Sequence, residues 1–580
     1  MSTIAARADS FIRDRLPPRG TWPDLRFDRA GLSYPPRLNA AAELVDAWIA
    51  RGHGDRPCII GPQETWTYAR FADTVDRIAR RLVENYGVIP GNRVLLRGPN
   101  TPMLAACWMA VVKAGAIAVP TMPLLRSGEL GQIIDKVAVR LALCDAAFLS
   151  EMEVAAAGRE LTIVRFNGEP GPGGAPAAGL EALLPATAPG FAAVDTAADD
   201  VALIIFTSGT TGVPKAAAHF HRDLLAVADL SPRSQLNATA DDVFCGSPTL
   251  AFAYGIGGLL LFPLRVGASV VLLERATGER LLTAMERHRA TLCFTVPTLY
   301  RAMTTLLEAE VVTVEALSSL RACVSAGEPL PASTFEAWYY ASGLPILDSL
   351  GTTEMLNAVI AMPPDAIRPG ATGRTVPGYE AMLVDDAFRP VPAGQIGRLA
   401  VRGPTGCLYI DDDRQRQYVQ HGWNLTGDAF HQDADGYFWY HARTDDMIVS
   451  AGYKISGLEV EDVLLRHEAV EECAVVAAPD PLRGTIPKAY VVIKRGVDAG
   501  DELARGLQDF VKDRIAPYKF PRDVAFIDAL PRTETGKIQR YKLRAMAQGE
   551  EGPRSITRIT DPGPDRGHTE PEDGGPGDGA

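Results

Sequence analysis

The segment TSGTTGVPK, at residues 207–215, combines hydroxyl side chains, glycines and a terminal cation. Glycines let backbone N–H groups approach an anion closely, hydroxyls add donors, and Lys215 supplies a mobile positive charge. A loop of this composition suits a polyphosphate. It is not a Walker A loop, GxxxxGK[ST], because Gly212 lies only three residues before Lys215 and Ala216 follows the lysine. Taken alone, the segment is equally typical of a surface turn rich in glycine and threonine.

Two more polar segments directly follow short apolar runs. SAGEP, residues 325–329, follows RACV, and DSLGTTE, residues 348–354, follows PIL. In a parallel α/β sheet, ligands bind at loops beyond the carboxyl ends of the strands. In the second segment a hydroxyl can contact a phosphate oxygen while Glu354 ligates a hard cation such as Mg²⁺. A lone GTTE sequence is more often a helix N-cap followed by an acidic first turn.

Three later positions also have the chemistry to bind a nucleotide or reach one. Asp428, in NLTGD, can accept hydrogen bonds from the two hydroxyls of a ribose, although a lone aspartate there is more often part of an Asx turn. The segment RTDD, residues 443–446, lies where the composition changes and a hinge is expected. Lys537, in PRTETGKIQR, lies on a glycine-containing turn from which it can reach a site in another domain. A single lysine of this kind is usually a solvated surface residue.

Length and composition limit the possible classes of protein. The 580 residues are 47% hydrophobic and 22% charged, which predicts a globular chain of roughly two to four domains. The net charge of −13 argues against a general nucleic-acid binder. No apolar run approaches the ~20 residues of a membrane span, and residues 1–20 lack the apolar core of a signal peptide. The eight cysteines are scattered without a CxxC pair, so we expect reduced, mostly buried thiols in a cytoplasmic protein.

The elements that position these residues follow an α/β pattern. RVLLRG at residues 93–98, an apolar helix at 103–115 and AIAVPT at 116–121 predict a βαβ unit with parallel strands. Strands and helices continue to alternate after residue 215, which predicts a second doubly wound sheet. Short strands with frequent turns after Thr372 predict a small β-subdomain. Beyond Asp445 the pattern indicates a compact α+β unit, and the Pro/Gly-rich acidic residues 549–580 are predicted to be disordered.

Five motifs occur together in a fixed order: TSGTTGVPK, GTTE, TGD, RTDD…AGYKISGLEVE and PRTETGKIQR. In this respect the chain resembles the adenylate-forming superfamily of acyl-CoA synthetases, adenylation domains and luciferases, roughly over residues 56–544. The resemblance implies a large N-terminal domain at residues 1–444 and a small mobile C-terminal lid at 445–548. The segments LPPRGTWPDL, AAAHFHRDLLA, AFAYGIGG, LDSLGTTEML and DGYFWYHARTDDMIVSAGYKI are most similar to benzoate-type aryl-CoA ligases, particularly 2-aminobenzoate–CoA ligases.

The reaction implied by this resemblance has two steps. An aromatic acid of the aminobenzoate, hydroxyanthranilate or benzoate type attacks the α-phosphate of ATP, which gives an acyl-adenylate and pyrophosphate. The thiol of CoA then displaces AMP to form a thioester. The alternative is a stand-alone adenylating enzyme that loads the phosphopantetheine of a carrier protein. A non-catalytic nucleotide-binding protein is disfavoured because Glu354, Asp428 and Lys537 are all present.

The resemblance also implies roles for individual residues. Lys537 would bridge the carboxylate and the α-phosphate, Thr353 would contact the α-phosphate, Glu354 would bind Mg²⁺, and Lys215 would contact the β,γ-phosphates. The other expected ATP-binding residues are Thr207, Ser208, Gly209, Thr210, Thr211, Gly212, Gly327, Glu328, Pro329, Asp348, Asp428 and Arg443. In the second step the lid is expected to rotate about Asp445, which would place Gly452 at a pantetheine tunnel.

The expected acid pocket combines small residues with one aromatic side chain, which suits a flat ring. Its members are Ala253, Tyr254, Ala326, Gly327, Leu350, Met355 and Asn357. Benzoate-type enzymes usually have histidine at the end of the motif (S/T)TEMLH, where this chain has Asn357. This departure keeps a polar group but removes a titratable one. It is consistent either with extra substituents on the substrate ring or with neutral drift.

Overall fold

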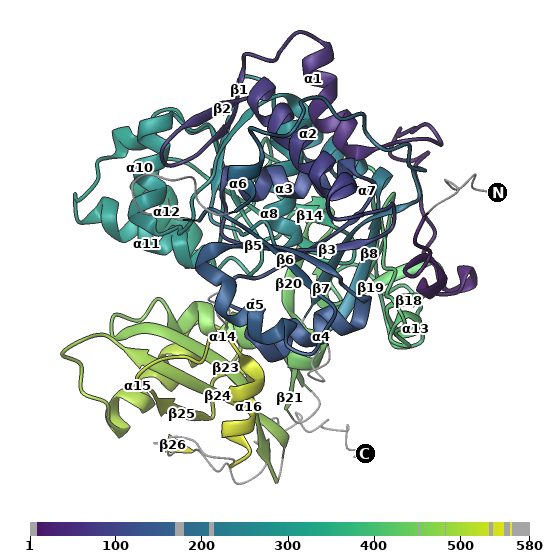
Figure 1. The fold of residues 1–580 in the computed structure, drawn as a ribbon. Helices are drawn as coiled ribbons and strands as arrows, with labels where there is room; N and C mark the ends of the chain where they lie inside the picture. The colour runs from purple at the N-terminus through teal and green to yellow at the C-terminus, as the bar shows by residue number, and fades with distance from the viewer. Residues whose placement is uncertain are drawn as a thin grey trace, which may run out of the picture. The chain divides into compact units, whose positions relative to one another are not determined.

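The computed structural model describes residues 8–168, 179–207, 214–450, 453–481, 483–532, 538–549 and 557–558. The chain forms two compact units, residues 1–445 and 446–580. Figure 1 shows the sheets and helices of each unit. Within the described residues, no helix is both long and apolar enough to cross a membrane.

The first sheet of the large unit contains the strand that precedes the phosphate-loop motif. Its strand order is β6-β5-β3-β4-β7-β8. The bounds are β3 Arg93–Arg97, β4 Ile117–Thr121, β5 Leu141–Asp145, β6 Thr162–Phe166, β7 Val201–Thr207 and β8 Lys215–Phe220. All neighbours pair in parallel except β7 and β8, which are antiparallel. Every residue of β3, β4 and β5 is buried, as expected for parallel strands covered on both faces.

The predicted βαβ unit is confirmed, since β3 and β4 are parallel and α3 (Pro102–Lys113) connects them. The Thr101 hydroxyl accepts a hydrogen bond from the Leu104 amide, which caps α3, and Pro102 occupies its first position. Apolar residues at helical spacing in α2 (Tyr68–Glu84) turn one face toward the core, where Phe71, Val75 and Ile78 are buried.

The second sheet has the order β15-β14-β13-β12-β11-β9-β10-β1-β2. Its bounds are β1 Pro57–Ile60, β2 Thr65–Thr67, β9 Val243–Gly246, β10 Ser269–Val271, β11 Leu292–Thr295, β12 Ala322–Ser325, β13 Ile346–Thr352, β14 Asn357–Ala361 and β15 Arg374–Thr375. The central strands are parallel, as predicted for a doubly wound sheet, and β2, β14 and β15 are antiparallel to their neighbours. All eight cysteines of the chain are free and buried, as expected from their spacing.

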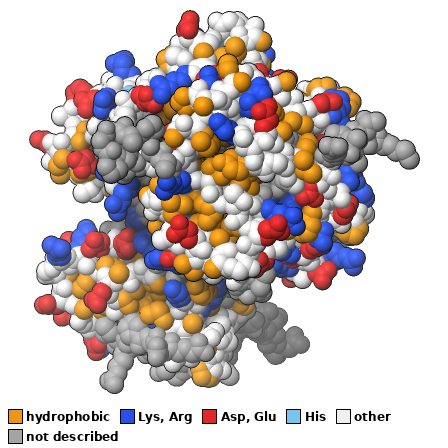
Figure 2. Space-filling view, in the orientation of Figure 1, with side chains coloured by type: hydrophobic (Ala, Val, Ile, Leu, Met, Phe, Trp, Pro, Cys, Tyr) orange, Lys and Arg blue, Asp and Glu red, His pale blue; other side chains and the backbone are white. Residues whose placement is uncertain are grey.

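The remaining helices of the large unit pack on these sheets. They are α1 Ala47–Ala50, α4 Ser127–Val137, α5 Leu149–Ala156, α6 Leu180–Leu183, α7 His221–Ser234, α8 Ala253–Ile256, α9 Phe262–Val266, α10 Gly278–His288, α11 Pro297–Glu308, α12 Ala332–Ser342 and α13 Gln415–Tyr418. On the face of this unit drawn in Figure 2, acidic and basic side chains are interspersed with apolar ones.

The β-subdomain predicted after Thr372 is the third sheet, with the order β16-β17-β19-β18 and β20 paired to β19. Its bounds are β16 Glu380–Val384, β17 Gly397–Arg402, β18 Val419–Gln420, β19 Trp423–Gln432 and β20 Phe438–Arg443. Each pairing in it is antiparallel.

The small unit has the predicted α+β character. Its elements are β21 Ile448–Ser450, β22 Tyr453–Ile455, α14 Gly457–Leu464, β23 Val470–Asp480, β24 Gly484–Ile493, α15 Asp501–Lys512, β25 Asp523–Phe526, α16 Arg540–Ala547 and β26 Thr557–Arg558. The short strand β26 differs from the disorder predicted for residues 549–580, because it pairs with β25. Without this pairing, β25 would expose an edge of unsatisfied backbone groups.

Candidate active site

The two ends of the predicted phosphate loop lie opposite each other. Thr207 ends β7, Lys215 begins β8, and the two residues pair in the antiparallel register. The loop between them contains the expected ligands Ser208, Gly209, Thr210, Thr211 and Gly212, which lie outside the described residues. Residues 207 and 215 therefore show that the loop joins β7 and β8, which form a β-hairpin at the edge of the first sheet.

Glu354 lies in the turn that joins β13 to β14, so the alternative that GTTE begins a helix is wrong. The amides of Met355 and Leu356 donate to the carbonyls of Thr352 and Thr353 at 3.2 Å each, which closes the turn. Leu356 has a positive φ of 57°, and β14 then returns antiparallel to β13. The turn holds the acidic side chain at the carboxyl end of a strand, where ligands of α/β sheets bind.

Two tyrosine hydroxyls donate hydrogen bonds to the Glu354 carboxylate. The Tyr409 hydroxyl donates to Oε1, and the Tyr418 hydroxyl lies 3.3 Å from Oε2. The Lys215 ammonium is in turn 3.3 Å from the Tyr409 hydroxyl. Only 7% of Glu354 is exposed. Lys215 and Glu354, which the sequence places in separate motifs, are therefore linked through one phenol oxygen.

Both tyrosines are fixed donors. Burial and the nearby Glu354 charge raise the pKa of the Tyr409 hydroxyl far above its usual range. The same two causes raise the pKa of Tyr418. Their rings pack edge to face, with centroids 5.7 Å apart. A protonated phenol carries no charge, so these donors orient the carboxylate without neutralising it.

The Tyr409 backbone is held on β8, the strand that begins with Lys215. Ala217 and Tyr409 form an antiparallel bridge, and Ala218 donates to the Leu408 carbonyl at 2.9 Å. The side-chain oxygen of the buried Gln415, in α13, accepts a hydrogen bond from the Tyr409 amide at 2.9 Å. Neither tyrosine is predicted from the sequence, because the two lie 55 and 64 residues from Glu354 and belong to no short motif.

Asp428 lies within strand β19, so its alternative assignment to an Asx turn is wrong. It pairs in register with Arg443 on β20, whose Nη1 donates to Asp428 Oδ1 and to the Thr426 carbonyl, each at 2.9 Å. Burial raises the pKa of Asp428, and the guanidinium opposes this effect. Gly427 has a positive φ of 78°, and a Cβ there would lie 2.7 Å from the Arg443 guanidinium. Glycine therefore permits the close approach of this pair.

Asp348 on β13 is paired in register with Ser325 on β12, so it lies beside the turn that contains Gly327, Glu328 and Pro329. Gly327 has a positive φ of 89°, as this turn requires. Asp348 is only 8% exposed, and its Oδ1 has no hydrogen-bond partner within the described residues. Burial raises the pKa of Asp348 to about 8, so the carboxyl is mostly protonated at neutral pH.

The predicted acid-pocket residues fall into two groups. Tyr254 on α8 donates its hydroxyl to the carbonyls of Thr295 at 3.1 Å and Val324 at 3.0 Å, and the buried Ala326 follows β12. Its neighbour Ala253 is partly buried against the main core. Because the Tyr254 hydroxyl is hydrogen-bonded to backbone carbonyls, mainly the aromatic ring of Tyr254 is left to contact a bound acid.

The second group packs near α7. Met355 is fully buried in a core cluster against which Leu350 packs. Asn357 begins β14 and accepts a hydrogen bond from Ser231 of α7 at 2.7 Å, and its side chain also hydrogen-bonds to the Tyr379 hydroxyl. Whether the two groups enclose one acid remains a prediction.

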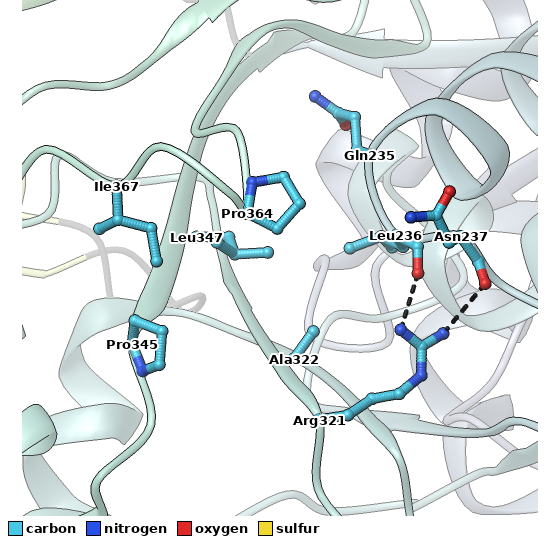
Figure 3. A pocket seen from close by; sticks show the side chains of 9 residues that line it. All are labelled: Gln235, Leu236, Asn237, Arg321, Ala322, Pro345, Leu347, Pro364 and Ile367. Atoms are coloured by element: carbon cyan, nitrogen blue, oxygen red, sulfur yellow. Dashed lines mark hydrogen bonds between the residues drawn. The ribbon is translucent and has the colours of Figure 1, made fainter.

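A separate cavity of about 140 Å³ lies at the opposite ends of β12 and β13 (Figure 3). It is lined by Gln235, Leu236, Asn237, Arg321, Ala322, Pro345, Leu347, Pro364 and Ile367. Arg321 donates to the Leu236 carbonyl at 2.7 Å and to Asp242, which ties β12 to the segment after α7. The cavity contains no predicted site residue, and we assign it a structural role.

Three predicted residues belong to the small unit or to its boundary with the large unit. Lys537 and Gly452 lie outside the described residues, and so does the side chain of Asp445. The Asp445 backbone lies in a short 3-10 turn, Thr444–Asp446, at the boundary between the two units.

The described residues fit a magnesium ion that is held jointly with a nucleotide. They contain no cluster of three or more His, Cys, Asp or Glu side chains able to hold a metal. Mg²⁺, however, is commonly bound by one or two carboxylates together with substrate phosphates. Glu354 supplies one such oriented carboxylate, and it is linked through the Tyr409 hydroxyl to Lys215, where the phosphate loop ends and β8 begins.

Comparisons with known proteins agree with this geometry. Residues 46–408 match the AMP-binding enzyme family, and residues 459–537 match the AMP-binding enzyme C-terminal domain. The benzoate–CoA ligase of Thauera aromatica is 35% identical over 518 residues, which cover 89% of this chain and 97% of that protein.

Two solved structures are also similar. The anthranilate CoA ligase AuaEII, in complex with anthranoyl-AMP, is 34% identical with a TM-score of 0.82, covering 89% of this chain and 98% of that one. A benzoate CoA ligase from Burkholderia xenovorans LB400 is 33% identical with a TM-score of 0.79, covering 87% and 100%. The chain therefore belongs to the AMP-binding, adenylate-forming enzymes, in the branch of AMP-forming acid–CoA ligases nearest the benzoate type.

Proposed function

We propose that this enzyme uses ATP to activate a benzoate that carries an amino or hydroxyl substituent, or benzoate itself, and transfers the acyl group to CoA. The carboxylate oxygen attacks the α-phosphate, the bond from that phosphorus to the bridging oxygen of pyrophosphate breaks, and an acyl-adenylate forms. The CoA sulfur then attacks the acyl carbon and AMP leaves. The observation that carries the proposal is the arrangement of three side chains: Lys215 begins β8, Glu354 follows β13, and Asp428 lies within β19 beside Arg443.

The first step concentrates negative charge on phosphate oxygens, so the site must offset it. Lys215, at the start of β8, would contact the β,γ-phosphates together with the hydroxyls of residues 207–211. When bound at Glu354, Mg²⁺ would supply further neutralisation of the triphosphate. Thr353, immediately before Glu354, would contact the α-phosphate.

The nucleoside is assigned to groups within β13 and β19 and in the turn that follows β12. Asp428 would accept hydrogen bonds from the ribose hydroxyls while Arg443 holds its carboxylate in place. Gly327, Glu328, Pro329 and the mostly protonated Asp348 would surround the adenine. A protonated carboxyl both donates and accepts a hydrogen bond, which suits the mixed edge of adenine.

Two observations support an aromatic acid. Tyr254 presents a ring whose hydroxyl is already engaged, and it lies near the small residues Ala253 and Ala326. Similar proteins bear the names benzoate–CoA, 3-hydroxybenzoate–CoA and anthranilate CoA ligase.

A panel of acids tests the substrate class. Benzoate, the three hydroxybenzoates, 2-aminobenzoate and hydroxylated 2-aminobenzoates are each incubated with enzyme and ATP, and pyrophosphate release is measured with and without CoA. Octanoate is the control acid. We expect at least one aromatic acid to give CoA-dependent turnover well above that with octanoate. If no aromatic acid releases pyrophosphate, the substrate class is wrong. If adenylate accumulates but no CoA thioester forms, a carrier-protein thiol becomes the better acceptor.

The two half-reactions test the proposed role of the small unit. We assign Lys537 to adenylation, Asp445 to the hinge and Gly452 to the pantetheine tunnel of the second step. Lys537→Ala is expected to slow adenylation by roughly 100-fold or more, because a cation is removed from the developing charge. Thioester formation from supplied acyl-adenylate should stay near the wild-type rate. Equal loss in both half-reactions would contradict two alternating conformations.

A further inference from the structure

We propose that Tyr409 and Tyr418 are positioning residues that aim the Glu354 carboxylate at the magnesium ion of bound ATP. The proposal rests on the proposed function only in taking Glu354 as the cation ligand. It assigns a role to two residues that have no part in the five sequence motifs.

The hydrogen bonds leave room for a cation. Each carboxylate oxygen has two lone-pair sites. Tyr409 donates to Oε1 and Tyr418 to Oε2, so each oxygen keeps one site for a metal ion. Held at both oxygens, the carboxylate cannot rotate freely about its last torsion. It is therefore oriented before the nucleotide arrives.

The hydroxyls of Tyr409 and Tyr418 are uncharged, so they orient Glu354 without reducing its negative charge. An arginine or lysine in the same place would offset the charge that attracts Mg²⁺. A protonated phenol supplies a strong hydrogen bond to an ionised acceptor and leaves the net charge of Glu354 unchanged. The two tyrosines therefore orient the ligand and preserve its affinity for a cation.

The support behind the two rings is rigid. The Tyr409 backbone is bonded to β8, and Gln415 of α13 accepts its amide while donating to the Cys407 carbonyl at 3.0 Å. Tyr418 ends the same short helix, and its one hydroxyl proton is shared between Glu354 Oε2 at 3.3 Å and the Thr352 hydroxyl at 3.2 Å, at the end of β13. The donors are thus fixed to both strands that bear the phosphate-binding and metal-binding motifs.

Tyr409 differs from Tyr418 in also contacting Lys215, so the two tyrosines test different sets of contacts. The Tyr409 hydroxyl accepts from the Lys215 ammonium at 3.3 Å while donating to Glu354. Removing the Tyr409 hydroxyl therefore disturbs a phosphate-binding cation as well as the metal ligand. Tyr418→Phe is the cleaner variant, and Tyr409→Phe is expected to show the larger effect.

The test measures binding of α,β-methylene-ATP, which cannot release pyrophosphate, by isothermal titration calorimetry. Wild type, Tyr418→Phe and Tyr409→Phe are each titrated in Mg²⁺ and again in EDTA. The quantity compared is the Kd in EDTA divided by the Kd in Mg²⁺, which reports how much Mg²⁺ tightens binding. We expect this ratio to fall roughly 10-fold to 100-fold in both variants, the usual cost of losing a partner of a metal ligand.

Tyr34→Phe is the matched control. The Tyr34 hydroxyl also donates to a carboxylate, that of Asp229, at 2.8 Å, and Asp229 is bonded to Arg265 outside the proposed site. This variant should keep the wild-type ratio, and thermal denaturation identifies any variant that is unfolded. If Tyr409→Phe is unfolded, the proposal is judged from the Tyr418→Phe result alone.

A Tyr418→Phe enzyme that is folded and keeps the wild-type ratio would overturn the proposal. So would equal weakening of binding in Mg²⁺ and in EDTA, because that result would show a general disturbance of the nucleotide site. The experiment contains no carboxylic acid substrate. A wrong substrate class therefore leaves its outcome unchanged, and the two proposals fail separately.

Discussion

Glu354 and Asp428 are both nearly buried carboxylates of the large unit, yet they are held by different kinds of partner. Glu354 accepts hydrogen bonds from two neutral phenols. Asp428 accepts one from the guanidinium of Arg443 at 2.9 Å. The first carboxylate keeps its net charge, whereas the charge of the second is largely balanced.

This difference matches the ligands that we propose for the two groups. A divalent cation needs an uncompensated negative charge, and a guanidinium beside Glu354 would compete with it. Ribose hydroxyls are neutral donors, so Asp428 can bind them while an arginine offsets the cost of burying its charge. The type of partner, in addition to the presence of a carboxylate, indicates what each site can bind.

Glu354→Gln tests the charged side of the comparison and has the largest expected effect. Glutamine still offers one oxygen to a tyrosine hydroxyl but carries no charge. Pyrophosphate release with the best acid should fall by roughly 100-fold to 1,000-fold, as for other groups that stabilise transition-state charge. The control Glu380→Gln, which removes a carboxylate bonded to Arg402 at 2.9 Å, should retain activity. Activity of Glu354→Gln within tenfold of wild type would contradict the metal-ligand role.

Asp428→Asn tests the balanced side. Loss of hydrogen bonds to a charged acceptor should raise the KM for ATP by roughly 10-fold to 100-fold. The more specific measurement is the ratio of kcat/KM for ATP and 2′-deoxy-ATP. Wild type should prefer ATP, and the variant should lose most of this preference. A preserved ratio would show that Asp428 does not contact the ribose.

Asp348→Asn tests a third carboxyl, whose Oδ1 has neither kind of partner among the residues that the structure describes. Its raised pKa of about 8 means that the folded chain keeps a proton that the unfolded chain loses near pH 4. Wild-type stability should therefore fall as pH rises toward 8. The variant lacks this dependence, so the difference in unfolding free energy between the two proteins should change by about 2 kcal/mol from pH 6 to pH 8. Urea denaturation at each pH measures it, and parallel curves would refute the protonated state.

Arg443→Gln tests the partner of Asp428 and has the smallest expected effect, because the Arg443 side chain is 55% exposed. The KM for ATP should rise by roughly twofold to fivefold at pH 8, the scale of a partly solvated ion pair. Since the guanidinium opposes the effect of burial, its loss raises the pKa of Asp428 further. The KM defect should therefore grow as pH falls toward 5. A defect independent of pH would limit Arg443 to a steric role.

Much of the fold could be predicted from local patterns. The apolar runs at residues 93–97 and 117–121 are the parallel strands β3 and β4, and the apolar segment between them is α3. Burial on both faces requires continuous apolar sequence, so such strands are visible without the structure. Local propensity was less informative where tertiary pairing prevailed: GTTE, which also suits a helix start, joins two antiparallel strands, and NLTGD lies within β19.

The amino-acid sequence alone identifies the side chains that can bind phosphate, a cation or ribose, and the order in which their motifs occur. It contained no sign that Tyr409 and Tyr418 hold Glu354, that Lys215 reaches the same phenol, or that Asp348 lacks a partner on one oxygen. Periodicity and turn composition record interactions among residues close in the chain. A contact across 55 or 64 residues depends on strand register and on the packing of separate segments, so the partners of each carboxylate are known only from the folded chain.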